Sequence, residues 1–275
     1  MESNAWSDWT TTKSATHTIS IRPGTYIAKV EVKDEGGLVS SDTTTVVVDK
    51  VVGSGETFMD TRDNNTYNMV IIGDQVWFAE NLAYLPLVTY GDLSKTEPYN
   101  YVYGYFGNDV DAAKETDNYK NYGVLYNWSA AMAGASSSSA NPSGVQGICP
   151  SGWHLPSDGE WKQLEQYIGI RYYPNEDDTR NEGWRGYDKL LKSTSGWEDD
   201  ANGTDNFGFK ALPGGYRNNY GSFNNINSGA KFWTSREANN DQDAWSRSLD
   251  YIWKGIDRTD YSHKDYGFSV RCIKD

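Results

Sequence analysis

Alternating apolar and polar residues mark the first part of the chain. Residues 26–33 (YIAKVEVK) alternate with a period of two, which predicts a strand with one buried face. Residues 39–48 are rich in β-branched side chains and predict a return strand, and Asp34-Glu35-Gly36-Gly37 suits the hairpin loop between them. We therefore expect residues 1–50 to form an all-β piece.

A change of composition divides the chain after this piece. Residues 51–56 are a Gly/Ser-containing linker, and residues 57–275 form the second domain. Residues 57–83 predict two strands joined by Gly73-Asp74. Residues 84–122 are polar and Tyr-rich with no clear period, so we expect an excursion from the core there.

Helical spacing predicts three helices in the middle of the chain, and short strands follow. The first helix is expected at 124–133 and the third at 182–192. For the second, Ser157 is the N-cap and Glu160 completes a capping box, ahead of Trp161, Leu164 and Ile168 on one face. After Ser193, strands are expected at 207–212, 232–235, 244–249 and 267–273. The second domain is thus predicted to be α+β.

The composition predicts an aromatic core. Only 37% of the residues are hydrophobic, below the roughly 45–50% of globular proteins, yet there are 11 Trp and 20 Tyr. Trp77, Trp128, Trp153 and Trp161 are therefore expected to pack inside. The apolar stretches are too short to span a membrane, so no membrane insertion is expected.

The net charge limits the class of binding partner, and the cysteine content bears on the compartment in which the protein works. The net charge is −13 and there is no basic run, which disfavours nucleic acid as a partner. Cys149 and Cys272 suit one disulfide in an exported protein or two buried thiols in a cytosolic one. Met1 leads directly into polar sequence without a signal peptide, which suggests a trimmed start or export by another route.

Four strings in the second domain carry a family resemblance. They are CPSGWHLPSDGEW (149–161), ALPGGYR (211–217), FWTS (232–235) and YGFSVRCIKD (266–275). Together and in this order they resemble the Fibrobacter major-paralogue family over residues 57–275. The resemblance implies a C-type-lectin-like fold near the formylglycine-generating-enzyme type. Residues 23–49 resemble the last strands of an immunoglobulin-like module of the polycystic-kidney-disease type, of which the first strands are missing.

The resemblance also bears on the cysteines. Cys149 and Cys272 stand where the family would place a structural bridge, which would close a loop of about 120 residues. The formylglycine-generating enzymes use cysteines in their active site, so their activity is not carried over to this chain. His154 lies inside the family motif, and we expect it to be packed and hydrogen-bonded rather than to act in acid–base chemistry.

Metal-binding and cofactor patterns are weak. The chain has no HExxH or CxxC spacing and no Gly-rich phosphate loop. An acidic turn at 198–205 offers clustered oxygens as calcium loops do, but it lacks the full EF-hand pattern and is also what a solvated turn would look like. The weak Ca²⁺ candidates are Asp199, Asp200, Asn202 and Asp205; no other cofactor is expected.

Residues 216–266 have the composition of a binding surface. Asn, Asp, Ser and Tyr make up 24 of the 51 residues, while Leu, Ile and Val together number four. Tyr and Trp give rigid amphipathic area, and short amides and hydroxyls give adaptable hydrogen bonds. The same composition is what a diversity-generating retroelement would leave after replacing asparagine codons; a plain solvated loop is the alternative.

The candidate contact residues lie within this segment. Trp245, Tyr251 and Trp253 are the expected anchors, because a partly exposed aromatic ring contributes most per residue at an interface. Odd positions from 245 to 253 would share one strand face, where Leu249 does not suit exposure, so one of these residues should pack inward. The full set is Tyr220, Asn224, Arg236, Asn239, Asp241, Trp245, Asp250, Tyr251, Trp253, Asp257 and Tyr261.

These observations favour a non-enzymatic ligand-binding protein. It would be an extracellular, cell-surface or virion protein, of the adhesin or phage receptor-binding type, with a protein or glycan ligand. One alternative is a structural or assembly subunit that forms homo-oligomers through the incomplete N-terminal sheet. Another is an enzyme of formylglycine-generating-enzyme descent, which would need a titratable cluster in a pocket.

Overall fold

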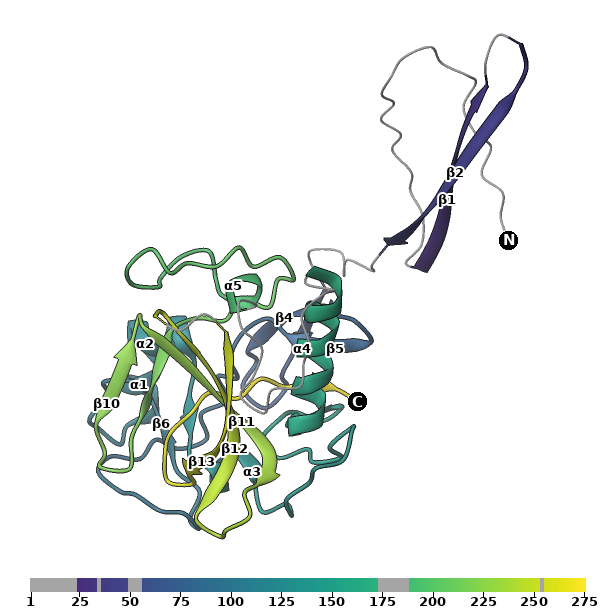
Figure 1. Ribbon diagram of the computed structural model, residues 1–275. Helices are drawn as coiled ribbons and strands as arrows, with labels where there is room; N and C mark the ends of the chain where they lie inside the picture. The colour runs from purple at the N-terminus through teal and green to yellow at the C-terminus, as the bar shows by residue number, and fades with distance from the viewer. Residues whose placement is uncertain (1–23, 34–35, 49–55, 173–187, 253–254) are drawn as a thin grey trace. The chain divides into compact units, whose positions relative to one another are not determined.

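The computed structural model describes residues 24–33, 36–48, 56–172, 188–252 and 255–275 (Figure 1). The chain divides into two compact units, Met1–Lys50 and Val51–Asp275. In the first unit, β1 (Gly24–Lys33) pairs antiparallel with β2 (Val39–Val48) along all ten residues of each strand. The predicted hairpin is confirmed, and its assignment to an immunoglobulin-like module stays a prediction.

The second unit is built on two five-stranded sheets. The first, which we call the terminal sheet, has the order β3-β4-β5-β14-β8, so the C-terminal strand lies between two early strands. Its strands are β3 (Thr57–Met59), β4 (Thr66–Ile72), β5 (Gln75–Phe78), β8 (Trp153–His154) and β14 (Ile273–Lys274). The predicted pair of strands joined at Gly73-Asp74 is confirmed as β4 and β5.

The second sheet, the late sheet, comes from one continuous stretch of chain. Its order is β10-β9-β11-β12-β13, and only the β9–β11 pair is parallel. Its strands are β9 (Gly214–Arg217), β10 (Phe223–Ile226), β11 (Gly229–Glu237), β12 (Asp243–Asp250) and β13 (Ile256–His263). With its many strands and few helices, the unit is α+β as predicted.

Among the described residues, five short or medium helices accompany the sheets. They are α1 (Val110–Lys114), α2 (Asp117–Tyr122), α3 (Trp128–Met132), α4 (Asp158–Tyr172) and α5 (Asp188–Leu191). The capping box of α4 is confirmed: the Glu160 amide donates to Ser157 Oγ at 3.1 Å, and the Ser157 amide donates to Glu160 Oε2 at 2.8 Å. In the described part of the chain, no helix is long and apolar enough to cross a membrane.

One of the predicted helices begins later than expected. Residues 125 and 126 form strand β7 (Leu125–Tyr126), which pairs with β6 (Asn100–Tyr101). The helix starts only at Trp128, because the Asn127 side chain caps it by accepting from the Ala130 amide at 3.0 Å. Of the helix expected at 182–192, residues 188–191 are helical and residues 182–187 lie outside the described residues.

Two of the predicted strands are wrong, because each segment bonds to distant partners other than a single neighbouring strand. Residues 207–212 form no strand: the carbonyls of Phe209 and Lys210 accept hydrogen bonds from the Arg271 side chain. Within residues 267–273, only Ile273 belongs to a strand, because the residues before it pair one by one with different elements. Gly267 bridges Arg217, Phe268 bridges Tyr126 and Ser269 bridges β11, so no single partner strand forms. The predicted strands at 232–235 and 244–249 are confirmed within β11 and β12.

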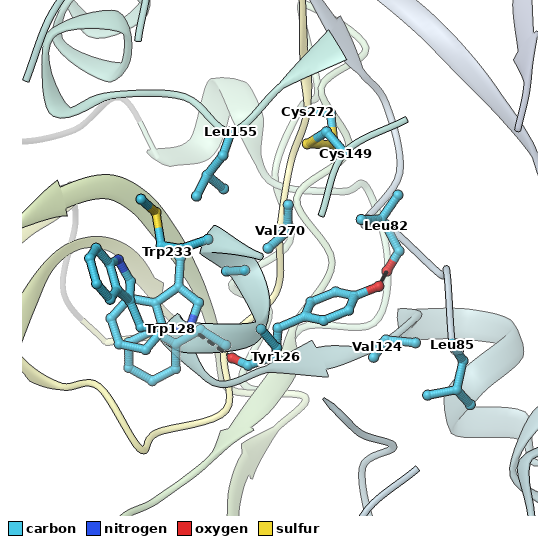
Figure 2. Packing of buried hydrophobic residues seen from close by; sticks show 14 of the residues in the cluster. Leu82, Leu85, Val124, Tyr126, Trp128, Cys149, Leu155, Trp233, Val270 and Cys272 are labelled. Carbon is cyan, nitrogen blue, oxygen red and sulfur yellow. Dashed lines mark hydrogen bonds between the residues drawn. A yellow bond between two sulfur atoms is a disulfide. The ribbon is translucent and has the colours of Figure 1, made fainter. Parts of the chain in front are cut away.

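The core is aromatic, as the composition predicts. Trp77, Trp128, Trp153 and Trp161 are all buried. The Trp233 indole also makes a hydrogen bond: its N–H donates to the Tyr126 carbonyl at 2.7 Å (Figure 2). The Trp233 ring stacks on the Phe268 ring, with their centroids 4.3 Å apart. The Cys149–Cys272 disulfide lies in the same cluster, which confirms the predicted bridge (Figure 2).

Candidate functional site

Two adjoining hollows open on the surface of the second unit. Their volumes are about 390 and 180 Å³, and they share Thr89, Tyr90 and Phe106. Their walls come from the long segment after β5 and from the β9–β10 hairpin. We call the two hollows together the aromatic cleft, lined by residues 88–92, 99, 105–108, 217, 220, 221 and 223.

Aromatic rings dominate the cleft and remain open to solvent. The exposed fractions of Tyr90, Phe106 and Tyr220 are 58%, 64% and 84%. Phe106 stands edge-on to Tyr90 at a centroid distance of 6.0 Å and to Phe223 at 5.7 Å. Since large apolar side chains of a soluble protein are usually covered, a group of exposed rings marks a surface for interaction.

Buried side chains hold the irregular segment that carries Tyr90 and Phe106 by hydrogen bonds to its backbone. The Asn127 amide donates to the carbonyls of Ser94 and Glu97 at 2.8 and 2.7 Å, and its oxygen accepts from the Tyr99 amide. The Tyr126 hydroxyl donates to the Tyr84 carbonyl at 2.7 Å. These bonds satisfy backbone groups that no strand or helix pairs, so the rings are presented on a fixed frame.

The opposite wall is the tip of the β9–β10 hairpin. The Asn218 side chain accepts hydrogen bonds from the amides of Tyr220 and Ser222, both at 2.9 Å, and thereby closes the turn. Gly221 has φ of +85°, a conformation that favours glycine. The turn places Tyr220 at its outermost point.

Arg217 forms part of the cleft wall and is 3% exposed. Its guanidinium lies over the Tyr101 ring, 4.1 Å from the centroid. Its backbone pairs with Gly267 in both directions, at 3.0 and 2.8 Å, and a Cβ at residue 267 would come within 2.9 Å of the Tyr101 ring. Burial lowers the pKa of Arg217, and Tyr101, Asp265 and Asp92 offset that effect only in part.

The sequence profile described as the Fibrobacter succinogenes major domain matches residues 70–274, which is well over half of the chain. The chain belongs to this family. Neither the curated proteins nor the solved structures gave a match. The matched residues include the whole aromatic cleft and, apart from Asp275, all four strings noted in the sequence.

The structure divides the predicted contact residues of this major domain between two places. Tyr220 lines the aromatic cleft, and Asn224 lies beside it on β10, half-buried, with its amide donating to the Ser222 carbonyl at 2.9 Å. The remaining described residues lie on or next to β11, β12 and β13. Trp253 lies outside the described residues.

Arg236 and Trp245 belong to a charged cluster at the start of α4. Asp158 accepts from Arg236 and Arg247, each at 3.0 Å, and from Arg258 at 2.7 Å. The half-buried Trp245 ring lies between two of these guanidinium groups, at 4.7 Å from Arg236 and 3.8 Å from Arg258. The cluster fastens α4 to the late sheet of the major domain.

The other predicted contacts are spread over the late sheet. Asn239 and Asp241 are exposed in the β11–β12 turn, while Asp250 and Tyr251 are half-buried at the far end of β12. On β13, Asp257 and Tyr261 are exposed. Of the odd positions on β12, Arg247 and Leu249 are buried, at 0% and 1% exposed, so these two side chains are not open to a ligand.

The weak calcium candidates are not assembled into a site. Asn202 Oδ1 accepts from the Trp197 amide at 3.0 Å and Asp205 Oδ1 from the Lys210 amide at 2.8 Å, so both oxygens close turns of the loop. Asp199 and Asp200 are exposed. Within the described ranges, no three His, Cys, Asp or Glu side chains gather as a metal site would require.

His154 is packed and hydrogen-bonded, as predicted. Its Nε2 lies 2.7 Å from Glu160 Oε1 and its Nδ1 lies 2.7 Å from Asp275 Oδ1. Burial disfavours the imidazolium, but the two carboxylates outweigh burial and raise the pKa of His154. The histidine therefore ties β8, α4 and the last residue together.

Sequence reasoning missed most of the aromatic cleft. Tyr90 and Phe106 lie in the segment that we expected only to leave the core, and Arg217 and Phe223 lie in the correct segment but were not selected. The Tyr-rich, aperiodic composition of 84–122 is the same signal that singled out 216–266. Applied to both segments, it would have pointed to both walls of the cleft.

Proposed function

We propose that this major-domain protein is a non-enzymatic, surface or extracellular ligand-binding protein whose ligand binds in the aromatic cleft. Membership of the family suggests a surface-type protein. The observation that carries the proposal is the exposure of Tyr90, Phe106 and Tyr220 on a frame fixed by buried hydrogen bonds. The role would be that of an adhesin or a phage receptor-binding protein.

Physical chemistry supports binding at these rings. An exposed ring gains the most free energy when a ligand covers it, and a ring that is already held in place loses little conformational entropy on binding. Polar groups that can orient a ligand, among them Thr89, Asp92 and Asn108, line the same hollow. This combination of apolar area with a few polar groups is typical of ligand sites.

We also propose that the late segment tolerates diversification by a retroelement. Tyr220, Asn239, Asp241, Asp257 and Tyr261 are exposed in the segment 216–266, and exchanging exposed side chains costs little stability. The buried Arg247 and Leu249 would stay constant. A near-copy of the 3′ end of the gene beside a reverse transcriptase gene would support this proposal, and copies that vary equally at 247 and 249 would contradict it.

The finer fold assignment remains part of the proposal. A C-type-lectin-like fold is supported by the terminal sheet, in which β14 lies between β5 and β8, and by the disulfide that joins the chain before β8 to the segment before β14. An experimental structure of the domain would test it.

A second candidate role rests on the N-terminal hairpin. Among the described residues of the first unit, β1 and β2 pair only with each other, and an isolated two-stranded sheet is marginally stable in water. A strand from a second copy would complete the sheet and make the protein an assembly subunit. Light scattering should then show oligomers at high concentration, whereas a strict monomer would count against this role.

The binding role is tested with labelled protein on a panel of bacterial cells. The variant Tyr90→Ala/Phe106→Ala/Tyr220→Ala should lose binding to every cell type that the unmodified protein recognises. Met59→Ala removes an exposed apolar side chain outside the cleft and should bind normally. If the triple variant binds as well as the unmodified protein, the aromatic cleft is not the site.

A further inference from the structure

Three arginines of the described residues are no more than 3% exposed, and two of them are fully satisfied by the protein. Arg271 donates to Asn81 Oδ1 and to the carbonyls of Phe78, Phe209 and Lys210. Arg247 donates to the carboxylates of Asp158 and Glu165. Both therefore have structural roles, because buried charges need partners.

Arg217 differs from these two. Within the described part of the chain, no oxygen accepts a hydrogen bond from its guanidinium, and its Nη1 is buried without a partner. The Tyr101 ring covers one face of the group but supplies no acceptor in that contact. A buried donor without an acceptor is costly and calls for an explanation.

The position of Arg217 beside a hollow explains why its guanidinium has no acceptor among the described residues. Arg217 and Gly221 both line the smaller hollow of the aromatic cleft. A Cβ at residue 221 would lie 3.2 Å from Arg217 Nη2, so the absence of a side chain there leaves space beside the guanidinium. Tyr220 and Phe223 line the same hollow. A ligand there would meet ring surfaces and an unused set of N–H donors together.

The surrounding charges limit what that ligand can be. Asp92 and Asp265 both act on Arg217 electrostatically, Asp92 lines the adjoining hollow, and the whole chain carries a charge of −13. A carboxylate on the ligand would be repelled by these groups. A hydroxyl group fits better, since it can accept from the guanidinium and donate to a carboxylate.

We propose that the aromatic cleft binds a neutral glycan, with a hydroxyl oxygen of one sugar accepting a hydrogen bond from Arg217. A pyranose ring offers both required features: C–H faces that pack on aromatic rings and neighbouring hydroxyls that accept and donate. Arg217 would then be a specificity-determining residue. This inference rests on the proposed function and names the ligand class of the same site.

The test uses immobilised oligosaccharides and the full chain. The probes are neutral gluco-, galacto-, manno- and xylo-oligosaccharides, with uronate-containing and sialylated oligosaccharides as the acidic set. At least one neutral probe should bind. Arg217→Met should weaken that binding about tenfold or more, because a hydrogen bond to a charged group is lost. Arg217→Lys should also weaken it, since lysine lacks the planar fork.

Stability separates this role from a structural one. Because Arg217 loses no protein hydrogen bond on substitution, Arg217→Met should melt within about 3 °C of the unmodified protein or above it. Lys162→Met, which removes an exposed cation on α4, should change neither property. A lower melting temperature for Arg217→Met with unchanged glycan binding would overturn the assignment.

The outcomes also separate this inference from the proposed function. If acidic oligosaccharides bind and neutral ones do not, the charge argument is wrong. If no oligosaccharide binds but cell binding still requires Tyr90, Phe106 and Tyr220, the ligand is not a glycan and the proposed function stands. If cell binding does not require these rings, both proposals fail.

Discussion

Asp158, the first residue of α4, pairs with Arg247 in the middle of β12 at 3.0 Å, and both side chains are buried. Arg236 and Arg258 bind the same carboxylate, and Glu165 accepts a second bond from Arg247. These ion pairs fix the helix to the late sheet, and each buried charge is compensated by a partner of opposite sign.

Asp158→Asn should destabilise the protein by about 3–5 kcal/mol, because the arginines lose the charge that compensates them. Burial would raise the pKa of Asp158, but Arg258 and Arg247 outweigh it and lower the pKa well below its ordinary value. The stability from this shift is present above the ordinary aspartate pKa of about 3.9 and is lost as the pH falls below it. Urea unfolding at pH 7 and pH 3 measures both effects; Asp199→Asn, at an exposed site, serves as the control.

Arg271→Met should cost about 3 kcal/mol or more, because it leaves the Asn81 side chain and three carbonyls without their donor. Arg217→Met is the matched comparison, since it removes a buried guanidinium that donates to no described oxygen. Urea unfolding of the two variants should give clearly different free energies. Equal losses would mean that the hydrogen bonds of Arg271 contribute little.

His154→Gln should flatten the pH dependence of the melting temperature. The pKa of His154 is raised in the folded state, so its contribution to stability is fully present below the ordinary histidine pKa of about 6.5 and is lost as the pH rises through the raised value. The unmodified protein should therefore lose stability more steeply than the variant as the pH rises above about 6.5. Parallel curves for the two proteins would refute the ion-paired histidine.

Cys149→Ala/Cys272→Ala should lower the free energy of unfolding by about 2–5 kcal/mol, since the bridge closes a loop with a sequence separation of 123. Adding a reductant to the unmodified protein should have the same effect in urea unfolding. Titration of the denatured, unreduced protein should find no free thiol, and two free thiols would contradict the bridge.

Local patterns predicted the parts of the fold that depend on local chemistry. The capping box of Ser157 and Glu160, the β4–β5 hairpin and the buried tryptophans each follow from neighbouring residues. The structure of the segments around Phe209 and Phe268 did not follow from local patterns, because it depends on distant partners such as Arg271 and Tyr126. Such partners leave no periodic signal in the segments they organise.

Of the two walls of the aromatic cleft, the sequence predicted only the hairpin wall, because the shape of the other wall also depends on a distant residue. Tyr220 stands at the tip of a hairpin and could be selected from composition. Phe106 and Tyr90 lie in an aperiodic segment whose shape is set by Asn127, which is far away in the sequence. On β12, Arg247 is buried because it pairs with Asp158 and Glu165 of α4, which a strand pattern alone does not show.

The most direct measurement compares two triple variants on the cell type that the unmodified protein binds best. Titration followed by flow cytometry gives a dissociation constant for each. Tyr90→Ala/Phe106→Ala/Tyr220→Ala should bind at least about thirtyfold more weakly, since anchor rings contribute about 2 kcal/mol or more. Trp245→Ala/Tyr251→Ala/Trp253→Ala, which changes three aromatic residues of the segment 216–266, should stay within about threefold. Undiminished binding by the first variant would contradict the aromatic cleft as the binding site.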